Sequence, residues 1–134
     1  MSVERREVLP LKNSNDVVLA RQKVRQWAIE LRFSLVDQTK LVTAASELAR
    51  NVLDHGKGGQ MAIEELSSGV RAGLRLAFED QGPGIPDIEL ALKDGYTSGS
   101  GMGLGLGGSK RLVNEFSIES VVGQGTKVTV TRWK

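Results

Sequence analysis

The sequence predicts an α+β protein in which helices cover one face of a mixed, mainly antiparallel sheet, as a two-layer α/β sandwich. Two stretches with apolar residues at helical spacing follow a first strand pattern. Two hairpin patterns with alternating apolar residues follow these helices. The chain has 134 residues, enough to bury one core, and we expect a single domain over residues 1–134.

The first part of the chain predicts one strand and two helices. Residues 6–12 alternate weakly and include Pro10, which is typical of an edge strand. Residues 14–33 carry apolar side chains at helical spacing, and a second helix extends over residues 35–54 until the sequence HGKGG ends it. The candidate N-caps of the first helix are Ser14, Asn15 and Asp16.

The second part predicts two hairpins with helices between them. Residues 60–80 predict a hairpin that turns at the sequence SSG. Residues 86–95 predict a short helix closed by Gly95, and residues 108–116 predict a longer one. Residues 117–133 predict a closing hairpin that turns at the sequence GQG. This order of elements leads to the two-layer arrangement.

Composition limits the classes of function. The net charge is only +2, no run of Lys and Arg occurs, and three Phe, two Trp and one Tyr are few for base stacking. The absence of cysteine excludes disulfides and thiolate metal sites and is typical of a reducing compartment. The apolar runs are too short to cross a bilayer, and the charged first ten residues do not resemble a signal peptide. We therefore expect a cytoplasmic protein that binds neither nucleic acid nor membranes.

A glycine-rich segment, GSGMGLGLGGSKR, extends from Gly99 to Arg111. It matches the dinucleotide pattern GxGxxG but does not directly follow a strand, and it lacks the ending of a P-loop. Glycines that turn successive N–H groups toward an anion, followed by a helix, are typical of phosphate sites. The alternative is a surface loop with a glycine hinge, and the segment alone does not decide between the two.

Two polar patterns precede this segment. Glu47 and Asn51 are four residues apart, so they project from one face of a helix. Asn51 offers a neutral oxygen to Mg²⁺ and Glu47 is a candidate base, although a solvated helix edge explains an isolated pair more simply. Asp80 ends an alternating strand, and Gly82 and Gly84 follow it. This arrangement suits recognition of the exocyclic amine of a base, and a plain turn is the alternative.

In their order and spacing these patterns resemble the N, G1 and G2 boxes of the GHKL superfamily of ATPases and kinases. The matching residues are Glu47 and Asn51, then Asp80, Gly82 and Gly84, and then Gly101, Gly103 and Gly105. The segment GQGTKVTV resembles the closing strand of that superfamily, where a threonine, here Thr126, helps to hold the adenine-binding aspartate. The resemblance covers nearly the whole chain and implies the Bergerat fold, with ATP and Mg²⁺ as cofactors.

Within the superfamily the chain resembles the anti-sigma-factor-type serine/threonine kinases, and in particular the switch kinases of the stressosome. The segments SELARN, HGKGG, EDQGPGIPDI and KRLVNEFSIESVVGQGT carry this resemblance. It implies phosphorylation of a serine or threonine on a STAS-domain partner, and binding and activation of a PP2C-type phosphatase by the released kinase. A homodimer stays open, because relatives in the family include dimers.

The resemblance also implies roles for single residues. Asp80 would accept the adenine amine with support from Thr126, Asn51 would ligate Mg²⁺, and Glu47 would act as the base toward the partner's hydroxyl. The glycines expected at the nucleotide are Gly82 and Gly84, and those expected to wrap the triphosphate are Gly101, Gly103 and Gly105. The lone histidine, His55, stands at the end of the helix that carries Asn51, and its position indicates either a neighbour of the site or a helix-end residue, with the structural role favoured.

Partner contacts carry no motif of their own. Arg21 is a candidate interface residue, because anti-sigma kinases use an arginine on the corresponding helix, and a solvated basic face is the alternative. Two other functions stay open beside the kinase. One is a nucleotide-dependent, anti-sigma-factor-like binding module, and the other is a slow ATPase without transfer to a protein.

Overall fold

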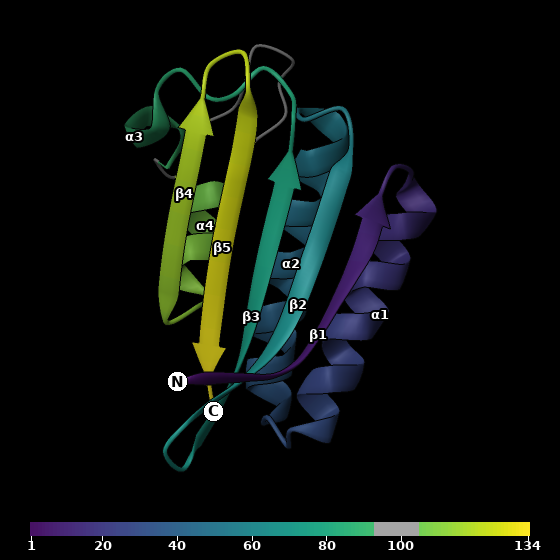
Figure 1. Ribbon diagram of the computed structural model, residues 1–134, viewed down its shortest axis with the longest axis vertical. Coiled ribbons are helices and arrows are strands. Elements are labelled where there is room, and N and C mark those ends of the chain that lie inside the picture. The colour runs from purple at the N-terminus through teal and green to yellow at the C-terminus, as the bar shows by residue number, and fades with distance from the viewer. Residues whose placement is uncertain (93–104) are drawn as a thin grey trace.

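The computed structural model describes residues 1–92 and 105–134, and these residues form one five-stranded sheet and four helices. The elements, in chain order, are β1 (Ser2–Leu11), α1 (Ser14–Glu30), α2 (Leu35–Asp54), β2 (Gly59–Ser68), β3 (Arg71–Asp80), α3 (Ile88–Ala91), α4 (Leu106–Arg111), β4 (Glu115–Val121) and β5 (Gly125–Trp133). The strand order is β1-β2-β3-β5-β4 (Figure 1). The predicted fold class is confirmed, and all four pairings between these strands are antiparallel.

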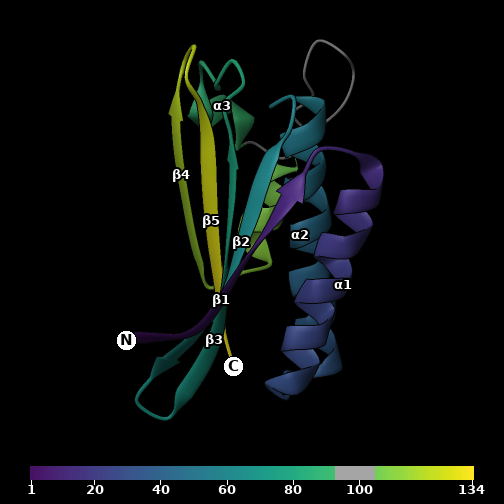
Figure 2. The same ribbon diagram turned by 45° about the vertical axis from the view of Figure 1, so that its right-hand side comes forward.

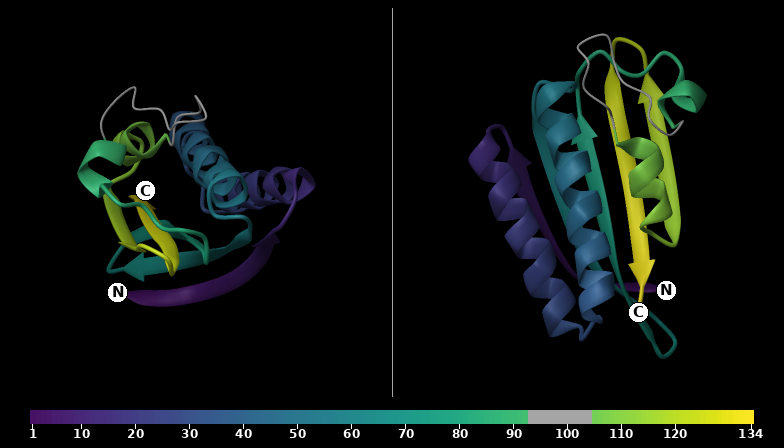
Figure 3. Two further views of the ribbon diagram at one scale, coloured as in Figure 1. Left: turned by 90° about the horizontal axis from the view of Figure 1, so that it is seen from above. Right: turned by 180° about the vertical axis from the view of Figure 1, so that it is seen from behind.

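The helices α1, α2 and α4 lie side by side on one face of the sheet, which leaves the other face uncovered (Figure 2 and Figure 3, right). Both chain ends lie near one end of the sheet (Figure 1). The C-terminal end of α2, the end of β3 and the β4–β5 turn all lie at the opposite end. Segments that are far apart in the sequence therefore meet at that end.

Strand alternation explains which side chains form the core. In β3, Leu74, Leu76 and Phe78 are buried under the helices, and Asp80 is the next residue in the same row. In β5, Val128 and Val130 are buried in the same way. The largest fully buried side chains that the helices add are Trp27, Leu41 and Leu48. The buried side chains of the strands and those of the helices form one apolar core, which holds the sheet and the helices together.

The predicted boundaries are accurate for α2 and less so for α1. The helix α2 spans residues 35–54 as predicted, with Ser34 as its N-cap. The N-cap of α1 is Asn13, whose side chain accepts a hydrogen bond from the backbone N–H of Asp16 at 2.9 Å. The predicted cap was therefore wrong by at least one residue, because several cap-forming residues stand in a row. The edge position of β1 is confirmed.

The helix predicted over residues 108–116 is wrong in extent. The helix α4 already ends at Arg111, and β4 begins at Glu115. Phe116 pairs with Val130 of β5, and the side chain of Asn114 accepts a hydrogen bond from the backbone N–H of Trp133 at 2.7 Å. The short helix α3 was predicted over a longer range, and its expected end at Gly95 lies outside the described residues.

Among the residues that the structure describes, none of the helices is both long enough and apolar enough to pass through a membrane.

Candidate active site

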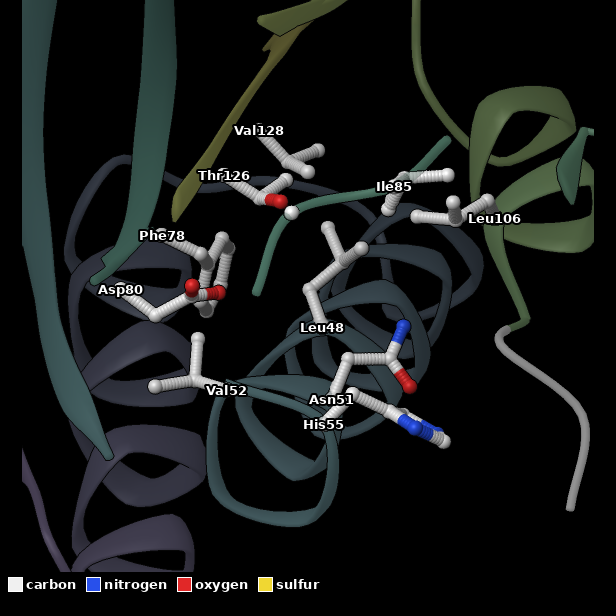
Figure 4. A pocket seen from close by; sticks show the side chains of 11 residues that line it. Leu48, Asn51, Val52, His55, Phe78, Asp80, Ile85, Leu106, Thr126 and Val128 are labelled. Carbon is white, nitrogen blue, oxygen red and sulfur yellow. The ribbon is translucent and has the colours of Figure 1, made fainter. Parts of the chain in front are cut away.

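A pocket opens where the C-terminal half of α2 faces the ends of β3 and β5 (Figure 4). Most of its wall is apolar, and its polar side chains come from α2 and its C-cap, from β3 and from β5. The lining residues are Leu48, Asn51, Val52, His55, Phe78, Asp80, Gly84, Ile85, Leu106, Thr126 and Val128. A largely apolar pocket with a few polar groups is typical of a small-molecule site.

Asp80 and Thr126 lie together at the sheet side of this pocket (Figure 4). They are direct partners in the register between β3 and β5. The backbone N–H of Gly82 donates to Oδ1 of Asp80 at 2.9 Å, and the hydroxyls of Thr126 and Ser120 are hydrogen bonded at 2.8 Å. The structure therefore brings together the carboxylate and the threonine that the sequence had matched to two separate motifs.

Glu47 and Asn51 lie one turn apart on α2, as their spacing predicts. Asn51 is half-buried and lines the pocket beside His55 (Figure 4). Glu47 is exposed and lies against Gly105, the N-cap residue of α4. Gly105 has a φ of +64°, which favours glycine, and a Cβ atom there would lie 2.6 Å from Oε2 of Glu47.

The glycine-rich segment is described only from its residue 105 onward. Gly105 lies against Glu47 and the next residue, Leu106, lines the pocket, so this end of the segment reaches the site. Gly101 and Gly103 lie outside the described residues. Their expected contact with a triphosphate therefore stays a prediction.

Gly82 and Gly84 hold the loop after β3. Gly84 has a φ of +78°, and a Cβ atom there would lie 2.6 Å from the backbone oxygen of Val121. The loop is also bonded to the β4–β5 hairpin, since the N–H of Gly123 donates to the oxygen of Pro83 at 2.8 Å. The loop is thus fixed against β4 and β5, and it forms one wall of the pocket.

Two site residues were underestimated or missed in the sequence. His55 ends α2 through its backbone N–H, which donates to the oxygen of Asn51, but its ring also lines the pocket. Nε2 of His55 is buried without a hydrogen-bond partner among the described residues. Ser120 supports Thr126 and also accepts from the N–H of Ile85 at 2.7 Å. The hairpin register about the GQG turn would have indicated the pair of Ser120 and Thr126.

Arg21 lies away from this pocket, on the exposed side of α1. It lines a shallow groove between α1 and α2. The other residues of the groove are Val18, Gln22, Arg25 and Val42. Neither the pocket nor the groove contains a cluster of three or more His, Cys, Asp or Glu side chains within the described ranges.

A family model described as histidine kinase-, DNA gyrase B- and HSP90-like ATPase matches residues 36–134. The chain therefore belongs to this ATPase family. It is 48% identical over 118 residues to the serine/threonine-protein kinase RsbT of Bacillus subtilis (strain 168), which covers 88% of this chain and 89% of that protein. It is also 28% identical over 128 residues to an anti-sigma F factor of Thermoanaerobacter sp. (strain X514), covering 92% of this chain and 89% of that protein.

Solved structures share the fold. The RsbU and RsbW domains of Rv1364c from Mycobacterium tuberculosis match with a TM-score of 0.62 at 20% identity, covering 96% of this chain and 32% of that chain. The catalytic domain of the histidine kinase ThkA matches with a TM-score of 0.53 at 15% identity, covering 98% of this chain and 95% of that chain. These findings confirm the predicted family and fold, and the relationship to RsbT confirms the predicted class of ATP-dependent serine/threonine protein kinase.

Proposed function

We propose that this protein uses Mg-ATP to phosphorylate a serine or threonine of a STAS-domain partner, and that the released kinase binds and activates a PP2C-type phosphatase. The observation that carries the proposal is the convergence of four motif residues at one end of the sheet. Asp80, Thr126 and Asn51 line one pocket, and Glu47 lies one helical turn from Asn51. The identity of 48% to RsbT supports the kinase activity, and the family resemblance implies the two partners.

The apolar part of the pocket suits an adenine ring. Phe78, Ile85 and Val128 supply apolar walls, and Asp80 ends the apolar row of β3 with a carboxylate. A carboxylate only accepts hydrogen bonds, so it pairs with the exocyclic amine of adenine and excludes a base with an oxygen at that position. In our proposal Thr126 supports Asp80 from the neighbouring strand.

Asn51 is the residue that would hold Mg²⁺. Magnesium prefers oxygen ligands, keeps several waters and takes few ligands from the protein itself. A single carboxamide next to a nucleotide pocket, without a cluster of carboxylates in the described residues, fits that preference. Bound Mg-ATP would supply the phosphoryl group and neutralise charge that develops on it.

Glu47 is the proposed general base. It is exposed, as a group that must reach a partner's side chain has to be, and Gly105 packs against it. In transfer, Glu47 would accept the proton of the partner's hydroxyl as that oxygen bonds to the γ-phosphorus of ATP, while the bond from this phosphorus to the β–γ bridging oxygen breaks and ADP leaves. The proposed triphosphate-binding residues are Gly101, Gly103 and Gly105. The loop beside the adenine ring is shaped by Gly82 and Gly84.

The groove at Arg21 is the proposed partner contact. Arg21 and Arg25 lie one turn apart on α1, and Val18 and Val42 give the groove an apolar floor. No ion pair of either arginine is found within the described part of the chain. Two cations beside an apolar surface suit an acidic segment of a partner protein. A pull-down with Arg21→Ala tests this, and undiminished capture of the partner would contradict it.

One experiment tests the proposed reaction. The protein is incubated with γ-labelled ATP, Mg²⁺ and a panel of STAS-domain proteins, and the label is followed by gel and mass spectrometry. Label on a serine or threonine of one partner supports the kinase. Label released only as free phosphate indicates a slow ATPase and contradicts transfer to a protein.

A second candidate function is a binding module that holds a sigma factor in a nucleotide-dependent way. The similarity to anti-sigma F factors, such as the one at 28% identity, favours it. The same incubation, together with a measurement of nucleotide binding, distinguishes the two functions. Tight binding of nucleotide without any turnover would favour the binding module over the kinase.

A further inference from the structure

Glycines from four segments surround Asp80. Gly56 belongs to the loop between α2 and β2, Gly59 begins β2, Gly82 follows β3, and Gly125 begins β5. A Cβ atom at Gly125 would collide with the backbone oxygen of Asp80, and one at Gly59 would lie 3.0 Å from its Cα. Real Cβ atoms essentially never approach other heavy atoms closer than 3.0 Å, so the backbone packs around Asp80 as tightly as glycine allows.

Gly56 differs from the other glycines because it faces the side chain of Asp80. A Cβ atom at Gly56 would lie 2.5 Å from both Cβ and Oδ2 of Asp80 and closer still to Cγ. These three atoms are the nearest neighbours of that position, and all of them belong to the Asp80 side chain. Gly56 is itself buried, and a Cβ atom at Gly82 would lie 2.7 Å from its Cα. Gly56 and Gly82 thus enclose the carboxylate from two sides.

The contact places the α2–β2 loop behind the base-recognition group. Oδ1 of Asp80 accepts from the N–H of Gly82, and the Oδ2 side of the carboxylate faces Gly56. Any side chain at position 56 would push the carboxylate from this orientation or push the loop away from β3. The expected result is a shift of the acceptor that reads the base, because hydrogen bonds weaken steeply with poor geometry.

We propose that Gly56 is a specificity-determining position whose missing side chain holds the Asp80 carboxylate in the orientation that recognises the amine of adenine. This inference rests on the proposed function, in which Asp80 reads the base. Gly56 acts through Asp80 and is therefore a positioning residue. The segment HGKGG contains Gly56 and contributes to the resemblance, but no role was assigned to this glycine there.

The first test compares ATP with ITP, which carries an oxygen in place of the amine. Dissociation constants are measured by calorimetry for the wild type and for Gly56→Ala. We expect Gly56→Ala to weaken ATP binding by about tenfold or more and to leave ITP binding within about twofold, because only the amine contact is lost. An unchanged ratio of the two constants would overturn the inference, whether binding as a whole is kept or lowered.

Gly69→Ala is the matched control. Gly69 lies in the β2–β3 turn with a φ of +62° and no atom within 4 Å of a Cβ position, so alanine strains the backbone far from the site. We expect lower stability with the wild-type ratio of ATP to ITP. If the wild-type protein binds ATP no better than ITP, the proposed role of Asp80 is contradicted. This outcome differs from the one that contradicts the role of Gly56, in which the wild type prefers ATP and Gly56→Ala keeps the same preference.

The second test needs no nucleotide, so it still gives a result if Gly56→Ala is too unstable for binding measurements. Urea unfolding is measured for the wild type, Gly56→Ala, Asp80→Gly and the double variant. Since the nearest atoms all belong to the Asp80 side chain, we expect alanine at position 56 to lower the midpoint in the wild type but not in Asp80→Gly. An equal decrease in both backgrounds would overturn the inference.

Discussion

At the scale of single residues, the site depends on where one carboxylate ends a row of apolar side chains. Asp80 follows Leu74, Leu76 and Phe78 on the same face of β3, so strand alternation directs it toward the helices rather than into solvent. The N–H of Gly82 and the neighbouring strand at Thr126 then fix its surroundings. A carboxylate at the end of an apolar pocket selects ligands that present a hydrogen-bond donor at that position.

Asp80→Asn tests this selectivity. The asparagine keeps an acceptor for the N–H of Gly82 but turns a donor toward the amine of adenine, and two donors face each other. We expect ATP affinity to fall by about 100-fold, the scale of an unsatisfied buried polar group. Calorimetry measures it, with Asp54→Asn on the exposed end of α2 as control. ATP affinity equal to that of the control would contradict the role of Asp80.

Glu47→Gln separates binding from transfer. Glutamine has nearly the same shape and keeps the contact with Gly105, so we expect ATP affinity within about twofold of the wild type. Without a base, single-turnover transfer to a STAS-domain partner should fall by about 10²- to 10⁴-fold. Quench-flow with labelled ATP measures the rate, and Glu4→Gln at the exposed start of β1 is the control. A wild-type rate would remove Glu47 as the base.

Residues that act through spacing along one element could be predicted from the sequence. Glu47 and Asn51 share a helix face, and Asp80 follows an alternating strand, so local periodicity is enough to place them. His55 was likewise expected beside the site, because it stands four residues after Asn51 at the end of α2, whereas the contact of Gly56 with Asp80 could not be predicted in this way. That contact depends on how the α2–β2 loop packs against a distant strand, which no local pattern encodes.

At the scale of elements, one ion pair joins the sheet to the N-terminal end of α2. Nη2 of Arg132 lies 2.7 Å from Oδ1 of Asp37, and Nη1 of Arg132 donates to the backbone oxygen of Leu112 at 3.0 Å. The Arg132 side chain is 16% exposed, so it is partly removed from water and depends on these acceptors. Asp37 also lies in the first turn of α2, where a negative charge stabilises the helix.

Asp37→Ala is expected to lower the free energy of unfolding by about 1–3 kcal/mol, because Arg132 loses its charged acceptor and α2 loses a favourable charge. Urea unfolding measures the loss. ATP affinity should stay within about twofold, since Asp37 lies at the opposite end of α2 from the pocket. Glu4→Ala is an exposed control. An unchanged free energy of unfolding would show that the pair contributes nothing.

The elements also show where periodicity fails. Leu112, Val113 and Phe116 fit helical spacing, which is why the sequence predicted a helix up to residue 116. In the fold, Phe116 is instead half-buried in β4 opposite Val130. A short apolar run is ambiguous between helix and strand, and the pairing with β5 decides it here. In α2, by contrast, consistent periodicity followed by the sequence HGKGG predicted the bounds correctly.

At the scale of the whole molecule, the pocket joins parts of the chain that fold against one another. Its wall includes α2, β3, β5, the loop after β3 and the start of α4, so a nucleotide bound there as proposed would contact both layers. A ligand that binds only the folded state stabilises that state by mass action. The stability of the molecule and the occupancy of the site should therefore be coupled, and the coupling can be measured without a partner protein.

We expect Mg-ATP at 100 times its dissociation constant to raise the free energy of unfolding by about 2.7 kcal/mol. Urea unfolding with and without Mg-ATP measures the increase. Asp80→Asn should lose most of it at the same concentration, because it no longer binds the base. Asp37→Ala should start from a lower stability and gain the same increase, because its damage lies far from the pocket. An equal increase in Asp80→Asn and the wild type would contradict nucleotide binding at this end of the sheet, whereas a smaller increase in Asp37→Ala would show that the α2–β5 ion pair also shapes the site.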